Sequence, residues 1–238
     1  MRSVYVAIMG GALISACGGE PEPKNAPPVT TTTAAPASAG PRVAVSQELG
    51  SIDDRAVSKT FDDLGSKFKA CQDGATKRLP FIAGSAKFFM RVGTDGRVKW
   101  SYLEDSSLGD YQTEKCLLDT INDADWPKPI GGDATVERDL TFDVGDARPP
   151  AEWTSDRVAA TVGKHKKALD RCLKEAGSAK FNVTAYIEPH GKEGKVVAVG
   201  VSTSSKEGQA QAECIVDAVK TMKMPSPGSY AAKVGFGL

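Results

Sequence analysis

The chain has 238 residues, of which 40% are hydrophobic and 25% charged, a composition typical of one or two globular domains. Lys plus Arg and Asp plus Glu both number 30, so the formal net charge is zero. This balance argues against nucleic acid as the partner, because phosphate binding depends on clustered cationic charge.

The amino-terminal segment has the pattern of an export signal. Arg2 precedes an apolar run from Val4 to Ala16, which is shorter than the about 20 residues of a membrane anchor but suits a cleaved signal peptide. The run ends in Ile-Ser-Ala before Cys17, which resembles the signal of bacterial lipoproteins. That resemblance implies a signal peptide over residues 1–16 and acyl chains, palmitate among them, on Cys17. An ordinary secretory signal with a chance cysteine is the alternative.

A low-complexity segment follows Cys17. The next two residues are Gly and not Asp, and the sorting rule of the lipoproteins that the signal resembles then implies the outer membrane, facing the periplasm. From Glu20 to about Pro41 the chain is rich in Pro, Thr and Ala and has little to bury. We therefore expect residues 17–50 to form a disordered, lipid-anchored linker in the cell envelope.

The remainder of the chain is a duplication. The stretch CLLDTINDADWPKP, which begins at Cys116, recurs as CIVDAVKTMKMPSP from Cys214, 98 positions later. The pentapeptide GSAKF also occurs twice, at 84–88 and at 177–181. We call residues 51–145 repeat 1 and residues 155–238 repeat 2.

Each repeat opens with a predicted helix that ends at a cysteine. Apolar side chains recur at steps of four and three residues, which places them on one helical face. The two stripes are 101 positions apart and consist of Val57, Phe61, Leu64, Phe68 and Cys71 in repeat 1, and of Val158, Val162, His165, Leu169 and Cys172 in repeat 2.

A hairpin, a second helix and a closing strand follow in each repeat. In repeat 1 we expect strands near 86–92 and 98–104 around the turn GTDG, and in repeat 2 a similar hairpin with the wider loop PHGKEG. A Ser-rich turn then offers N-caps for the helix that carries Cys116 or Cys214, and Pro-x-Pro ends that helix. The closing strands are predicted at 135–144 and 230–236, and GDARPPAEWT joins the repeats as a short linker.

These patterns predict an α+β fold of two tandem modules. Each module reads helix, strand, strand, helix, strand, which predicts a three-stranded antiparallel sheet with two helices on one face. Four cysteines remain beside Cys17, an even number for an oxidising compartment. The duplication favours disulfides of Cys71 with Cys116 and of Cys172 with Cys214, while free buried thiols and bridges between the repeats are the alternatives.

The order of elements is similar to that of the TonB C-terminal domain, and more closely resembles the AgmX/PglI C-terminal domain of envelope and gliding-motility proteins. The residues that carry the resemblance are Cys71, Asp95, Gly96, Val98, Ser106, Ser107, Cys116, Trp126 and Pro127, and in repeat 2 Cys172, Gly194, Val196, Ser204, Ser205, Cys214, Pro225 and Pro227. Repeat 2 has Met224 in place of the aromatic residue and is the more divergent copy.

The resemblance implies a module that binds protein, because domains of the TonB type recognise extended peptides by adding a strand to a sheet edge. The closing strands of both repeats are the candidate edges, especially that of repeat 1 with its polar alternation. Proteins of the TonB type usually have a membrane-spanning helix and a motor partner, whereas here we expect a lipid anchor and no spanning segment. Energy transduction is therefore not inferred for this chain. We expect a non-catalytic lipoprotein that acts as a binding or scaffolding component, in an envelope or gliding-motility complex.

Catalytic patterns are weak. The two histidines are His165, on the helical stripe, and His190, in the predicted hairpin loop, and neither has a partner at a metal-binding spacing. There is no C-x-x-C pair, and no cofactor is predicted. Trp126 and Trp153, both near prolines, are interpreted as core residues, with an interface role as the alternative. The other functions considered are a periplasmic thiol-redox or metal-dependent enzyme and a purely structural envelope subunit with no peptide ligand.

Overall fold

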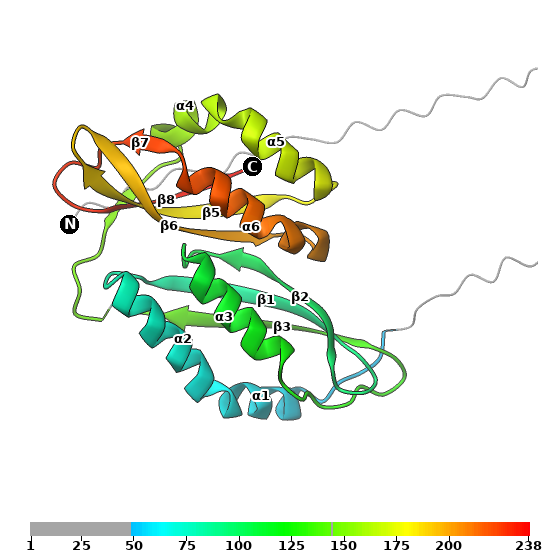
Figure 1. Ribbon diagram of the computed structural model, residues 1–238. Coiled ribbons are helices and arrows are strands. Elements are labelled where there is room, and N and C mark those ends of the chain that lie inside the picture. The colour runs from blue at the N-terminus through cyan, green and yellow to red at the C-terminus, as the bar shows by residue number, and fades with distance from the viewer. Residues whose placement is uncertain (1–48, 144) are drawn as a thin grey trace, which may run out of the picture. The chain divides into compact units, whose positions relative to one another are not determined.

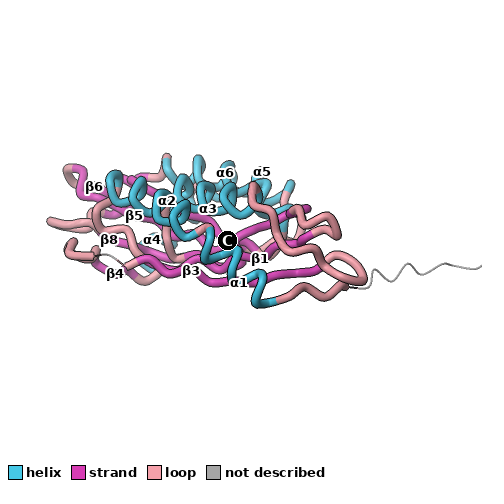
Figure 2. Tube along the Cα trace, turned by 90° about the horizontal axis from the view of Figure 1, so that it is seen from below, coloured by secondary structure: helices cyan, strands magenta, loops and turns pink. Residues whose placement is uncertain are grey.

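The computed structural model describes residues 49–143 and 145–238, which belong to one compact unit (Figure 1). The predicted signal peptide, Cys17 and nearly all of the predicted linker lie outside these residues. The described residues form a mixed α+β fold with six helices and two sheets, one of three antiparallel strands and one of five mixed strands. Figure 2 shows helices α2, α3, α5 and α6 on one side of the strands.

Repeat 1 contains three helices and one sheet. The elements are α1 (Asp54–Asp63), α2 (Gly65–Arg78), β1 (Gly84–Val92), β2 (Val98–Ser106), α3 (Tyr111–Asn122) and β3 (Ala134–Phe142). The strand order is β2-β1-β3, with both pairs antiparallel. The Asp53 side chain caps α1 by accepting from the backbone N–H groups of Arg55 and Ala56, as its position before the predicted helix suggests.

Repeat 2 has the same central order, β6-β5-β8, again antiparallel. Its elements are α4 (Asp156–Lys164), α5 (Lys166–Glu175), β5 (Phe181–His190), β6 (Glu193–Thr203), α6 (Lys206–Lys220) and β8 (Ala232–Gly237). Two strands of three residues extend this sheet: β4 (Ala151–Trp153) pairs in parallel with β8, and β7 (Lys223–Pro225) pairs antiparallel with β6. The predicted linker therefore contributes a strand.

The opening helix is interrupted in both repeats, whereas the apolar stripe predicted one continuous helix. The interruptions fall at Leu64 and His165, which occupy the same position in the two stripes. A glycine lies near each, Gly65 directly after Leu64 and Gly163 two residues before His165, and glycine weakens a helix because it leaves the backbone more freedom. The apolar stripe continues across the interruption, because α2 and α5 place Phe68 and Leu169 on the same buried side.

Two other local predictions were wrong. The hairpin of repeat 2 has a two-residue connection and not a wide loop, because β5 and β6 pair as far as His190 and Glu193, and Gly191 has the positive φ of 63° that a tight turn needs. The Ser-rich turn caps only α6, where Ser205 accepts from the N–H of Gly208. In repeat 1 the hydroxyl of Ser106 instead donates to Glu114.

Each repeat has its own hydrophobic core between its helices and its sheet. Trp126, Phe61 and Leu117 lie in the core of repeat 1, and Trp153, Leu169 and Ile215 lie in that of repeat 2. Both tryptophans are buried, as predicted. A third, smaller cluster joins the repeats and includes Leu79 and Phe81 of repeat 1 and Tyr186 of repeat 2.

Candidate functional site

The sheet edges differ in how far they are covered. In β2 the backbone N–H of Leu103 donates to Oε1 of Gln209 in α6, at 3.1 Å. In β6 the N–H of Val201 donates to Oε2 of Glu114 in α3, at 2.8 Å. The far side of β8 is paired with β4, and β4 and β7 have only three residues each. Among the described strands, the nine-residue β2 and β3 both have an outer edge that pairs with no other strand, but β2 lies against β6 and α6 of repeat 2, so β3 has the open long edge.

The backbone groups that point outward from β3 can be assigned. Asp133 accepts a hydrogen bond from the N–H of Gly50 with its carbonyl oxygen, so this carbonyl points away from β1. Backbone direction alternates with a period of two along an antiparallel strand. The N–H and C=O groups of Thr135, Glu137, Asp139 and Thr141 therefore point toward the free edge.

A groove of about 610 Å³ runs beside this edge. Its lining comes from α1, α2 and the second half of β3, and consists of Ser58, Phe61, Asp62, Gly65, Phe68, Lys69, Gln72 and residues 138–142. Phe61, Phe68 and Phe142 are buried and give the groove an apolar floor. Asp62, Lys69 and Asp139 are exposed, so both signs of charge lie around it.

Arg138 places a cation inside this groove. It occupies an inward-facing position of β3, in line with Val136 and Leu140. Its Nη2 donates to the Ser58 hydroxyl at 2.7 Å, and its guanidinium lies 5.3 Å from the centre of the Phe61 ring. Its Nε is buried and has no hydrogen-bond partner among the described residues. The site thus combines a free strand edge, an apolar floor and one unused donor.

In repeat 2 the corresponding edge is occupied by the chain itself. Ala151 to Trp153 of β4 pair with Ala232 to Val234 of β8, and the Trp153 side chain enters the core. In repeat 1 the residues that precede α1 make only a short contact, since Gly50 and Ser51 bond to Asp133 and Ile130 just before β3 begins. The structure therefore contains one filled edge and one open edge of the same type.

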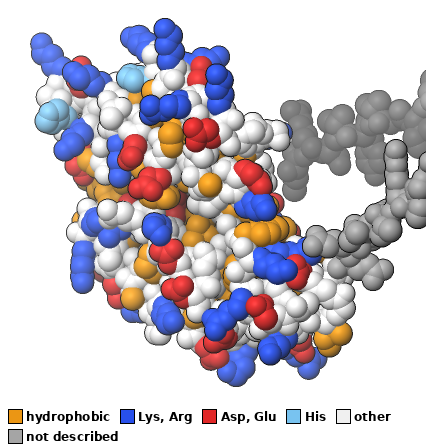
Figure 3. Space-filling model, turned by 45° about the vertical axis from the view of Figure 1, so that its right-hand side comes forward, with side chains coloured by type: hydrophobic (Ala, Val, Ile, Leu, Met, Phe, Trp, Pro, Cys, Tyr) orange, Lys and Arg blue, Asp and Glu red, His pale blue; other side chains and the backbone are white. Residues whose placement is uncertain are grey.

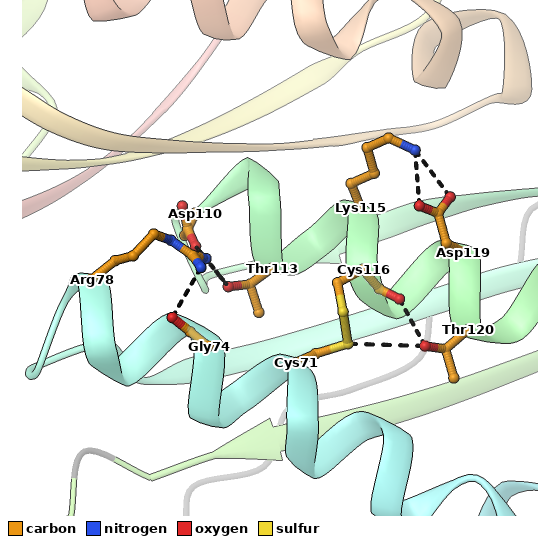
Figure 4. Close-up of a disulfide and its surroundings, with 9 residues drawn as sticks. All are labelled: Cys71, Gly74, Arg78, Asp110, Thr113, Lys115, Cys116, Asp119 and Thr120. Atoms are coloured by element: carbon orange, nitrogen blue, oxygen red, sulfur yellow. Dashed lines mark hydrogen bonds and ion pairs between the residues drawn. A yellow bond between two sulfur atoms is a disulfide. The ribbon is translucent and has the colours of Figure 1, made fainter.

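A disulfide joins two helices within each repeat, with the pairing that the duplication predicted. Cys71 of α2 bonds to Cys116 of α3, and Cys172 of α5 bonds to Cys214 of α6. Figure 4 shows the first of them between the two helices. A polar cluster also links the end of α2 to the start of α3. Arg78 pairs with Asp110 and donates to Thr113, whose hydroxyl donates to Asp110.

The two histidines lie apart from the groove. His165 occupies the break between α4 and α5, where its Nδ1 lies 2.9 Å from the carbonyl oxygen of Thr161. His190 is exposed at the end of β5. Within residues 49–143 and 145–238, no group of three or more His, Cys, Asp or Glu side chains is placed to hold a metal ion. None of the helices in the same residues has both the length and the apolar character to span a membrane.

The strand β3 was one of the two candidate strands predicted from the sequence, but two features of the site were not predicted. The inward position of Arg138 could have been predicted, because Arg138 lies two residues from both Val136 and Leu140, and residues two apart in a strand lie on the same face. The pairing of β4 with β8 could not be predicted in this way, because the three residues of β4, between two prolines and a helix, are too few to show an alternating pattern.

The comparisons with known proteins gave no match: no family model, no curated protein and no solved structure is similar to this chain.

Proposed function

We propose that this chain is a non-catalytic cell-envelope lipoprotein that binds protein partners through its two modules. The modules are of the TonB C-terminal type, duplicated as in the AgmX/PglI resemblance, and acyl chains on Cys17 hold the protein in the outer membrane, facing the periplasm. The partner is an envelope protein or peptide, in an envelope or gliding-motility complex. No energy transduction and no cofactor is part of the proposal.

The observation that carries the proposal is the open edge of β3. Four residues present outward backbone groups along this edge, and a groove with an apolar floor lies beside it. An extended peptide that adds to the edge would gain main-chain hydrogen bonds there, while alternate side chains of the peptide would enter the groove. β4 on β8 gives support from within the chain, because there a short extended segment pairs at the edge and buries a tryptophan.

The decisive variant removes one outward donor from the edge. Asp139→Pro deletes the outward N–H of residue 139 but leaves the hydrogen bonds toward β1 in place, and proline is tolerated on an edge strand with this orientation. Asp139→Ala is the matched control, because it removes the same exposed side chain and keeps the N–H.

A displayed library of unstructured peptides, selected on the chain from Gly18 onward, supplies the probe. We expect titration of a selected peptide to show binding that Asp139→Pro weakens by at least tenfold, the size of one main-chain hydrogen bond of roughly 1.4 kcal/mol. Asp139→Ala is expected to bind within about twofold of the parent chain. Equal binding to all three chains, or selection of no peptide, would refute strand addition at β3.

A further inference from the structure

The two repeats differ in charge although the whole chain is neutral. Residues 49–143 carry 17 Asp and Glu against 13 Lys and Arg, and residues 145–238 carry 10 against 14. The first part therefore has a net charge of −4 and the second of +4. Figure 3 shows Lys and Arg side chains gathered over the end of the molecule where α4 and α5 lie in Figure 1.

Five exposed cations on α4 and α5 account for much of this difference: Lys164, Lys166, Lys167, Arg171 and Lys174. At 100° per residue, the four that lie in α5 fall within an arc of about 140°, opposite the buried Leu169 and Cys172. Asp170 is the acidic residue within this arc. None of the five cations forms an ion pair with another described residue. We call this surface the cationic face.

The duplication provides an internal comparison. Along the shared stripe, Lys164 and Lys174 take the places of Asp63 and Asp73, and these aspartates are ion-paired with Lys59 and Lys69 in repeat 1. The same architecture therefore folds without the cationic face. Lys166 and Lys167 lie in the first turn of α5, where a positive charge opposes the helix dipole, whereas Lys164 and Lys174 lie in the last turns of α4 and α5, where it is favourable. Stability of the fold therefore does not explain Lys166 and Lys167.

We infer that the cationic face docks on the surface of an anionic phospholipid bilayer. Clusters of four to eight Lys and Arg on one side of a helix attract anionic headgroups, each charge adding a modest free energy near the surface. Four of the five cations are lysines, whose long stems let the ammonium groups reach headgroups from a helix. Leu173, half-buried at the margin of this arc, adds apolar surface. No aromatic side chain lies on α4 or α5 to stack on nucleic-acid bases.

The inference rests on the envelope location that the proposed function includes, but not on peptide binding by β3. A lipid chain and a polybasic surface together give the two signals that stable membrane attachment needs. Docking through α4 and α5 would also restrict how the protein is oriented at the membrane. The open edge of β3 belongs to the other repeat and is not part of the docking surface.

The test uses the chain from Gly18 onward, without acyl chains, and vesicles of phosphatidylcholine alone or with one third phosphatidylglycerol. This chain keeps every described element and both disulfides. We expect binding to the anionic vesicles only, weakened by salt. The triple variant Lys166→Glu, Lys167→Glu, Lys174→Glu is expected to lower the partition coefficient roughly a hundredfold.

The matched control reverses three exposed lysines of repeat 1, Lys67→Glu, Lys77→Glu and Lys128→Glu, which also have no ion pair among the described residues. It changes the net charge by the same amount and is expected to retain most of the binding. An equal loss in both variants would overturn the inference, because net charge alone would then explain binding. Equal binding to neutral vesicles, tighter binding to duplex DNA, or self-association that the cationic variant abolishes without any vesicle binding would overturn it as well. Titration of a selected peptide against the same variants shows separately whether the edge of β3 binds peptide.

Discussion

Glu114 and Val201 lock the two repeats together at a buried junction. The Glu114 side chain leaves α3 of repeat 1 and accepts the N–H of Val201, on β6 of repeat 2, at 2.8 Å. Gln209 makes the reciprocal bond to Leu103, which precedes Val201 by the repeat offset of 98. Each repeat therefore covers part of the hairpin edge of the other with one helix side chain, and β2 and β6 lie against each other at this junction.

Replacing Glu114 tests whether this junction responds to pH. Burial raises the pKa of the Glu114 carboxyl from its ordinary value of 4.5 to about 7, and the nearby Asp110 adds to the rise, while the bonds from Ser106 and Val201 oppose it. Because the pKa of Glu114 is higher in the folded than in the unfolded state, Glu114 contributes to the free energy of unfolding below pH 4.5, and this stabilisation is lost as the pH rises through 7. The full stabilisation is about 3 kcal/mol.

We expect the free energy of unfolding of the parent chain to fall between pH 5 and pH 8 by up to that amount. Glu114→Gln keeps the size of the side chain and one carbonyl acceptor but cannot ionise, so its stability should change much less over the same range. Urea titrations at the two pH values measure both. If the two chains show the same pH dependence, the carboxyl of Glu114 does not titrate in this window.

Gly200 tests how closely the repeats approach at this junction. A Cβ atom at Gly200 would lie 2.2 Å from Oε1 of Glu114 and 2.8 Å from Cα of Gly109. We expect Gly200→Ala to lower the free energy of unfolding by about 2–3 kcal/mol, the usual cost of overpacking. Gly235→Ala in β8 is the control, because nothing lies within 4 Å of its added Cβ. Thermal melts of both variants show the contrast, and similar melting temperatures would mean that the junction adapts.

The elements that repeat were predictable, because each pattern could be checked against its copy. The cysteine helices, the hairpins and the closing strands follow from periods of 3.6 and 2 that occur in both repeats, and the pairing of the cysteines follows from the duplication. The break at Leu64 and His165 was not predictable from the apolar stripe, since the stripe continues through it. Local glycines, and not the periodicity, mark that position.

The features that depend on the other repeat were beyond the sequence patterns. Glu114 lies on the apolar face of α3 with Leu117, Leu118 and Ile121, which marks it as buried but does not name Val201 as its partner. The closing strands of both repeats, β3 and β8, were predicted as candidate edges. That β3 is the open one, while β8 is covered, depends on the three residues of β4, whose pairing is non-local.

Removal of the disulfides tests their share of the stability. Each closes a loop of similar length, with sequence separations of 45 and 42. The chain-entropy description assigns such a loop about 4 kcal/mol. We therefore expect the double variant Cys71→Ala, Cys116→Ala to lose about that amount in urea unfolding, and the double variant Cys172→Ala, Cys214→Ala to lose a similar amount. A loss below about 1 kcal/mol in either would show that packing between the helices suffices.

Trp153 decides whether β4 holds the edge of β8 closed. Its ring lies in the core of repeat 2, with the Arg157 guanidinium 5.0 Å from its centre, so Trp153→Ala removes buried contacts and one cation–π interaction. We expect a loss of about 3–5 kcal/mol in unfolding free energy and faster hydrogen exchange at Lys233, the β8 residue opposite Glu152. Arg157→Ala, the control, should cost less than about 1 kcal/mol. If exchange at Lys233 stays slow in Trp153→Ala, backbone pairing alone holds β4 in place, and the tryptophan is not what separates the filled edge from the open one.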